Sequence, residues 1–99
     1  MTALYTLDQL KNCLTPVFRK NHVRSAVLFG SYAKGSATEN SDIDLMVDSG
    51  LHGLSFFGLL DDVCRALQCD VDLIDQADIH PGSLVDREIR QIGVLIYEQ

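Results

Sequence analysis

The chain has 99 residues, 46% of them hydrophobic, and a formal net charge of −6. This length and composition predict one domain, residues 1–99, with a single hydrophobic core. The sequence contains no apolar run of about 20 residues, which excludes a membrane span, and its negative charge argues against direct binding of nucleic acid. The three cysteines form no CxxC pair, as expected of reduced thiols in a cytoplasmic protein.

A helix is expected near the start of the chain. Thr6 and Gln9 form a capping-box pattern, so the helix begins at Leu7. Pro16 interrupts the apolar stripe that follows, and it predicts either a kink or the start of a second short helix. We favour one kinked helix that ends near Asn21.

Strand and helix patterns alternate over the rest of the chain. The last helix begins after Ser83, and Val85, Ile89 and Ile92 are expected on its inward face. This alternation predicts an α/β (α+β) domain with a small mixed β-sheet flanked by helices. The expected elements are a strand at 25–29, a helical turn at 31–34, a loop at 35–41, a strand at 43–47, a helix at 54–68, a strand at 71–74, a helix at 84–91 and a strand at 94–97.

The stretch 26–48 carries the strongest chemical signal. An apolar run ends at Gly30-Ser31, and after a spacer of ten residues Asp42 and Asp44 stand at the head of the next apolar run. Residues two apart in a strand point to the same side, so these carboxylates would lie side by side. Like charges at this distance repel unless a cation lies between them, and a hard divalent cation with oxygen ligands suits that role.

A metal site needs further oxygen ligands, and the run at 69–75 offers them. Asp72 lies between two apolar residues in a strand pattern, where a charge is costly unless it is paired, bound to metal or turned to a cleft. Asp70 would lie on the same face of the strand and is the alternative. We prefer Asp72 because it is more central, and we expect Asp75 and Asp78 to cap or flank the following loop.

Together these motifs resemble those of the DNA polymerase β nucleotidyltransferase superfamily. The pattern is Gly-Ser, a spacer of ten residues, Asp-Ile-Asp, and a later apolar-Asp-apolar unit. The fuller string from Leu28 to Leu45 is similar to that of the minimal nucleotidyltransferases, small prokaryotic proteins with little beyond the catalytic fold. The motifs cover residues 26–48 and 70–74, and the order of elements agrees over nearly all of the chain.

The resemblance implies transfer of a nucleoside monophosphate, with ATP as the expected donor, to a hydroxyl group. It implies that two Mg²⁺ ions take part. Lys34 stands where arginine is common in the family, and lysine cannot make the bidentate phosphate contact. The residues that the resemblance assigns are Asp42, Asp44 and Asp72 for catalysis and metal binding, and Gly30, Ser31 and Lys34 for nucleotide binding.

The resemblance also implies a protein partner. Minimal nucleotidyltransferases commonly act beside a helical toxin of the HEPN type, and some members attach AMP to a tyrosine of that toxin. This chain is too short to carry an additional domain that would hold an acceptor, so the acceptor would be held by another chain or by a second copy of this one. The alternative is an antitoxin without catalysis, which neutralises its partner by occlusion.

Overall fold

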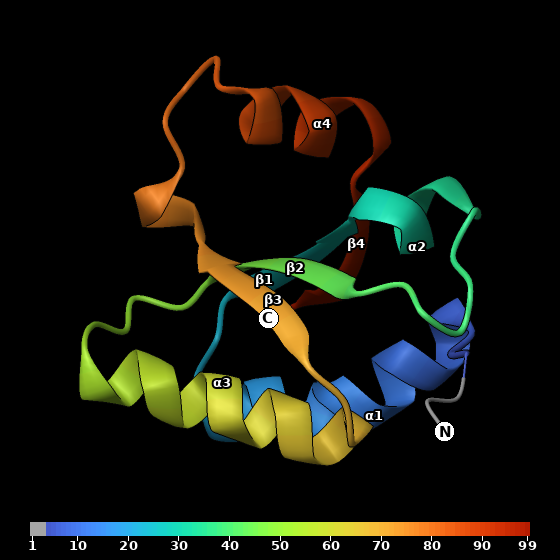
Figure 1. Cartoon of the computed structure of the whole chain (residues 1–99). Coiled ribbons are helices and arrows are strands. Elements are labelled where there is room, and N and C mark those ends of the chain that lie inside the picture. Colours follow the sequence, from blue (N-terminus) through green and yellow to red (C-terminus); the bar gives the residue numbers. More distant parts are fainter. Residues whose placement is uncertain (1–3) are drawn as a thin grey trace.

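The computed structural model describes residues 4–99 and arranges four strands in one mixed sheet with helices on both faces (Figure 1). The strand order is β3-β2-β1-β4. The central strand β1 (Ser25–Phe29) is antiparallel to both β2 (Ile43–Asp48) and β4 (Val94–Glu98), whereas β3 (Val71–Asp75) lies parallel to β2. The predicted small mixed sheet flanked by helices is therefore confirmed.

One face of the sheet carries the hydrophobic core. The helices α1 (Leu7–Lys20) and α3 (Leu54–Leu67) cover this face (Figure 1). Side chains alternate between the two faces along a strand, so Asp44 and Met46 of β2 point away from the core. The core side chains are Leu10, Leu14, Phe18, Val23, Ala26, Leu28, Ile43, Leu45, Val47, Leu59, Val63, Leu67, Val71, Leu73 and Ile96.

The first helix begins as the sequence predicts. The Thr6 hydroxyl accepts a hydrogen bond from the Gln9 N–H, and the Gln9 side chain accepts one from the Thr6 N–H, which completes the capping box. Pro16 lies inside a single helix that ends at Lys20, with Asn21 as its C-cap. No helix within residues 4–99 is long and apolar enough to cross a membrane.

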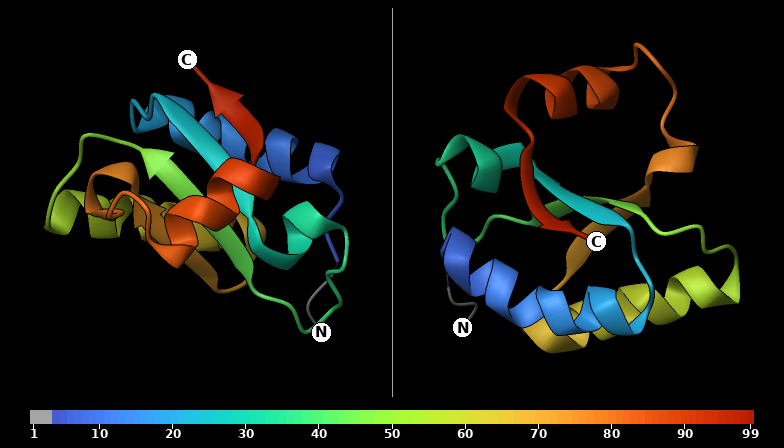
Figure 2. Two further views of the ribbon diagram at one scale, coloured as in Figure 1. Left: turned by 90° about the horizontal axis from the view of Figure 1, so that it is seen from above. Right: turned by 180° about the vertical axis from the view of Figure 1, so that it is seen from behind.

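The opposite face of the sheet carries α2 (Gly30–Lys34) and α4 (Leu84–Ile92) (Figure 2). α4 packs against β1 and α2 but has no fully buried residue. The prediction that Val85 faces inward is wrong, because 38% of it is exposed. Val85 borders a cavity with Ile74 and Ile79, and its neighbour Leu84 is 82% exposed.

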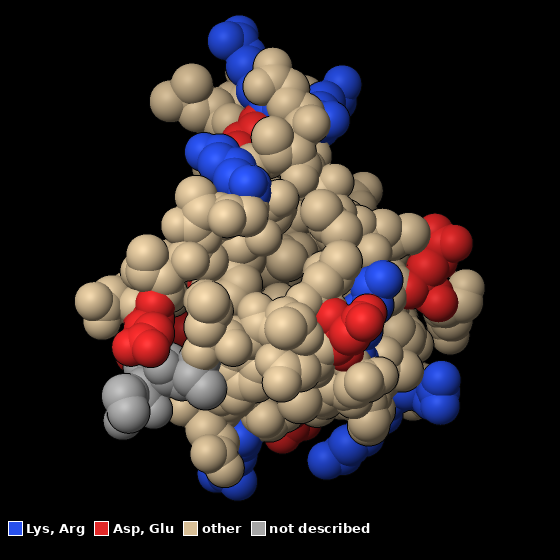
Figure 3. All heavy atoms as spheres, turned by 90° about the vertical axis from the view of Figure 1, so that its right-hand side faces the viewer, with Lys and Arg blue, Asp and Glu red and all other residues tan. Residues whose placement is uncertain are grey.

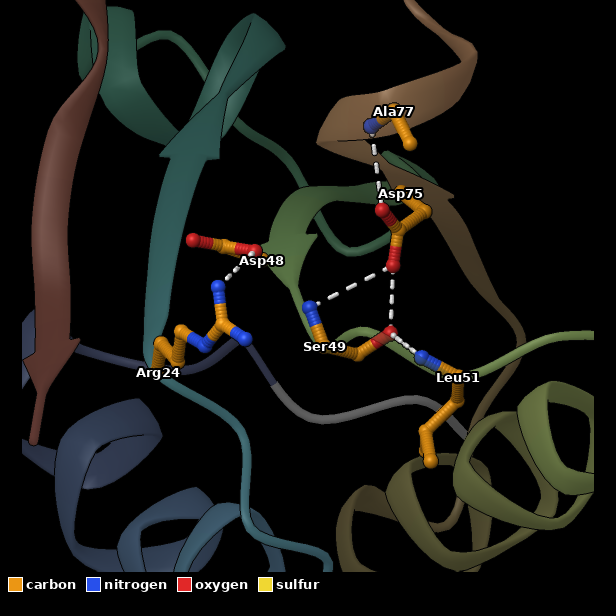
Figure 4. A network of polar contacts seen from close by, with 6 residues as sticks. All are labelled: Arg24, Asp48, Ser49, Leu51, Asp75 and Ala77. Carbon is orange, nitrogen blue, oxygen red and sulfur yellow. Dashed lines mark hydrogen bonds and ion pairs between the residues drawn. The ribbon is translucent and has the colours of Figure 1, made fainter.

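A buried aspartate ties together the ends of β2 and β3 (Figure 4). Asp75 is 6% exposed, and its carboxylate accepts hydrogen bonds from the backbone N–H and the hydroxyl of Ser49. It also accepts one from the Ala77 N–H, 3.0 Å away, which caps the short 3₁₀ helix η1 (Gln76–Asp78). The predicted capping role of Asp75 is confirmed, and the network fixes β3 beside β2 at this end of the sheet.

Candidate active site

Asp44 and Asp72 lie directly across from each other on neighbouring strands. The parallel pairing of β2 with β3 places Asp44 opposite Asp72 in register. Neighbouring strands are about 4.7–4.9 Å apart, and both residues alternate with buried residues of the core face. The structure therefore brings two of the predicted acids side by side on the face that α2 and α4 cover.

The environment of Asp44 disfavours its negative charge. Burial and the charge of Asp72 raise the pKa of Asp44 to about 6, with smaller contributions from a hydrogen bond to Asp72 and from the charges of Asp42 and Glu88. Only a protonated carboxyl group can donate that hydrogen bond to Asp72. Like charges at short range raise a carboxyl pKa in this way, and a bound cation would lower it again.

Gly30 lies against the Asp44 carboxylate. Its chain neighbour Phe29 pairs with Asp44 across the antiparallel β1–β2 ladder. Gly30 has a φ of +71°, and a Cβ atom there would lie 2.1 Å from Asp44 Oδ2. Only glycine combines this backbone angle with so close an approach, so the Gly-Ser motif starts α2 immediately beside the acidic pair.

α2 ends at Lys34, and its side chain pairs with α4. Lys34 Nζ lies 3.3 Å from Glu88 Oε1, and both side chains are partly exposed. Glu88 was not among the residues predicted for the site. A signal was present, because Glu88 lies three residues after Val85 and four before Ile92, on the predicted inward face of the helix. A carboxylate at an inward position needs a cation, a hydrogen-bond donor or solvent as its partner.

Asp42 lies just before β2 and is exposed. Together with Asp70, the alternative third acid, it lines a cavity of about 210 Å³ that also includes Tyr32, Glu39, Asn40, Ser41, Ile43 and Cys69. Within residues 4–99, no three His, Cys, Asp or Glu side chains lie close enough together to hold one metal ion. The structure thus pairs Asp44 with Asp72 and leaves Asp42 beside Asp70 at the neighbouring cavity.

The acidic pair suits a hard divalent cation in its donor chemistry. Asp44 and Asp72 offer only carboxylate oxygens, which are the ligands that Mg²⁺ prefers. The raised pKa of Asp44 reflects burial and repulsion from Asp72, and a cation between the two groups would relieve that repulsion. Asp42 is near enough for its charge to act on Asp44, but it can serve as a third donor only by moving closer, because residues 4–99 hold no cluster of three such side chains around one point.

Comparison with known proteins identifies the family. The family model described as "Polymerase beta, Nucleotidyltransferase" matches residues 12–99. The chain belongs to this family. The residues that match the family model begin inside α1 and continue to the last residue, so they include the acidic pair and the Gly-Ser motif. The resemblance predicted from the motifs is confirmed, and the chain is a nucleotidyltransferase.

Two curated relatives of this nucleotidyltransferase are protein adenylyltransferases by name. The protein adenylyltransferase MntA of Thermococcus cleftensis is 33% identical over an alignment of 86 residues, which covers 81% of this chain and 87% of the relative. A Methanocaldococcus jannaschii protein named as an adenylyltransferase is 42% identical over 83 residues, which cover 76% of this chain and 83% of the relative.

Solved structures of toxin–antitoxin complexes share the fold. One of them, a toxin–antitoxin complex with AMP-PNP, matches with a TM-score of 0.75 and 27% identity over 90% of this chain and 73% of that chain. Another, a tri-AMPylated Shewanella oneidensis HEPN toxin in complex with an MNT antitoxin, matches with a TM-score of 0.71 and 22% identity over 95% of this chain and 74% of that chain. At 22% identity, the similarity to the HEPN toxin–MNT antitoxin complex supports the fold alone.

Proposed function

We propose that this nucleotidyltransferase transfers AMP from ATP to a tyrosine hydroxyl of a HEPN-type partner, and that it thereby acts as the partner's antitoxin. The tyrosine oxygen forms a bond to the α-phosphorus, the bond between the α- and β-phosphates breaks, and pyrophosphate leaves. The observation that carries the proposal is the Asp44–Asp72 pair beside Gly30 in a chain of this family. Two features of related proteins support it: a relative is named protein adenylyltransferase MntA, and a structural neighbour is a toxin–antitoxin complex with AMP-PNP.

In this proposal the Gly-Ser motif and α2 receive the triphosphate. Gly30 has no side chain to keep a phosphate away from the backbone, and Ser31 adds a hydroxyl group at the start of α2. Lys34, at the other end of α2, supplies a positive charge. Since Gly30 touches the Asp44 carboxylate, a phosphate held at the motif would also lie beside the acidic pair.

In this proposal Asp72 receives the acceptor. β3 is one of the two edge strands of the sheet and Asp72 is exposed on it, so a hydroxyl group of another protein can reach this side chain from solvent. A carboxylate within hydrogen-bond reach of that hydroxyl can accept its proton. The partner chain would supply the rest of the acceptor site.

Asp42, Asp44 and Asp72 are the residues that would hold Mg²⁺. When bound, Mg²⁺ would neutralise charge on the triphosphate and lower the pKa of the attacking hydroxyl group. The contribution of the chain itself is to position the phosphates and the proton acceptor next to each other, which is the larger part of phosphoryl-transfer catalysis.

The proposal is tested by weighing the partner. A purified HEPN-type protein is incubated with this chain, Mg²⁺ and ATP, and its intact mass is recorded against a control without ATP. The expected result is a gain of one or more AMP groups, located on tyrosine by fragmentation. Tight binding of the partner with no change in its mass would contradict the transfer and support neutralisation by occlusion.

A further inference from the structure

An ion pair joins the two helices on the sheet face that holds the acidic pair. Lys34 is the last residue of α2 and Glu88 lies near the middle of α4. Their side chains meet at 3.3 Å, with 51% of the Lys34 side chain and 34% of the Glu88 side chain exposed. The pair is the polar link between the element that follows the Gly-Ser motif and the helix that covers this face.

Glu88 adds a negative charge to an acidic site. Its charge acts on Asp44, together with the charges of Asp72 and Asp42. Other basic groups recorded in ion pairs within residues 4–99 are engaged elsewhere, since Arg90 pairs with Asp86 inside α4 and Arg24 with Asp48 at the far end of β2. Figure 3 shows basic side chains at the end of the molecule formed by α4, and both acidic and basic side chains on the body below it. The Lys34 charge beside the Gly-Ser motif is therefore already neutralised by a carboxylate.

We propose that Glu88 is a positioning residue that holds Lys34 in the nucleotide-free protein and releases it to the triphosphate when ATP binds. This inference rests on the proposed function. A triphosphate carries several negative charges and many acceptor oxygens, so it competes well with one partly exposed carboxylate for the same ammonium group. Glu88 keeps the long lysine side chain beside the motif, and it lowers the affinity for ATP because it must be displaced.

The variant Glu88→Gln keeps the size of the side chain and removes the competing charge. Because a partly exposed ion pair is weak, the expected gain in affinity for ATP is modest, about two- to five-fold, which is about 0.4–1 kcal/mol at 1.4 kcal/mol per tenfold change. A matched control is Asp61→Asn. Asp61 pairs with Arg65 at 3.0 Å on α3, at the other face of the sheet, so this variant also removes one negative charge and one ion pair.

The experiment measures the binding of ATP by calorimetry, with Mg²⁺ and without the partner, for the wild type, Glu88→Gln, Lys34→Met, the double variant and the Asp61→Asn control. We expect tighter binding for Glu88→Gln, no gain when Glu88→Gln is added to Lys34→Met, and unchanged binding for the control. If Glu88 weakened ATP binding only by long-range repulsion, Glu88→Gln would raise the affinity whether or not Lys34 were present. Loss of the gain in affinity in the double variant would therefore show that Glu88 acts through Lys34.

Two results would overturn the role of Glu88: equal or weaker binding by Glu88→Gln, or the same gain in the presence and absence of Lys34. Either result leaves the proposed function intact if the wild type binds ATP and modifies its partner. A wild-type protein that binds no ATP would instead refute the proposed function together with this inference.

Discussion

Replacing Gly30 by alanine would force the Asp44 carboxylate out of place. The new Cβ atom would lie 2.1 Å from Asp44 Oδ2, whereas ordinary contact begins at 3.4 Å, so the carboxylate must move by about 1.3 Å. Gly35 provides a matched control, because its φ of +77° resembles the +71° of Gly30 but no atom lies within 4 Å of a Cβ placed there. Both variants carry the cost of a left-handed alanine, about 1–2 kcal/mol, and only Gly30→Ala carries the clash.

A displacement of about 1 Å in a catalytic group costs on the order of 10²-fold in rate. We therefore expect Gly30→Ala to slow single-turnover transfer of AMP to the partner by about that factor, and Gly35→Ala to stay within a few-fold of the wild type. Circular dichroism and urea unfolding would verify that both variants fold. Equal transfer rates for the two variants would refute the idea that contact between Gly30 and Asp44 sets the geometry of the site.

Two further predictions concern stability. The pKa of Asp44 is raised to about 6, above its ordinary value of 3.8, so its contribution to stability is full below about pH 4 and is lost as the pH rises through 6. The free energy of unfolding is measured by urea titration in EDTA at several pH values, for the wild type and for Asp44→Asn. Between about pH 4 and pH 6 it should fall by about 1 kcal/mol more for the wild type than for the variant, after allowance for solvent screening. Parallel pH profiles of the two proteins would contradict this prediction. Asp75→Ala leaves the Ser49 and Ala77 donors unpaired and should lower the free energy of unfolding by about 2–4 kcal/mol. The control Asp78→Ala, at an exposed position, should change it little. Equal urea midpoints for the two variants would show that the network adds no stability.

The alternation of residues in strands made much of the site predictable. Asp44 and Asp72 each lie between apolar residues in short strand patterns, and a carboxylate that interrupts a buried run must be paired or face a cleft. The structure places Asp72, and not Asp70, across from Asp44, and the choice of Asp72 as the third acid of the site stays a prediction. The register of two strands that are far apart in sequence could not be derived from either strand alone, because it depends on how α3, which connects them along the chain, packs on the sheet.

Local sequence patterns could not predict the contacts on the sheet face that α2 and α4 cover. The pairing of Lys34 with Glu88 depends on how α4 crosses the sheet, and helical periodicity gives the inward face of a helix but not what lies opposite it. The same limit explains the wrong expectation for Val85. Periodicity places Val85 on the apolar stripe, but the side chain borders a cavity with Ile74 and Ile79 instead of packing tightly, and 38% of it stays exposed.

The central claim, that Asp44 and Asp72 together form the catalytic pair, is tested most directly by comparing three isosteric variants in one AMP-transfer assay. Asp44→Asn and Asp72→Asn should each reduce transfer to the partner to background. Asp70→Asn should transfer at a rate close to that of the wild type, because Asp70 is exposed and lies outside β3, beside Asp42 at the neighbouring cavity. Normal transfer by either Asp44→Asn or Asp72→Asn would show that these two residues do not form the catalytic pair, and an inactive Asp70→Asn beside an active Asp72→Asn would assign the role of Asp72 to Asp70.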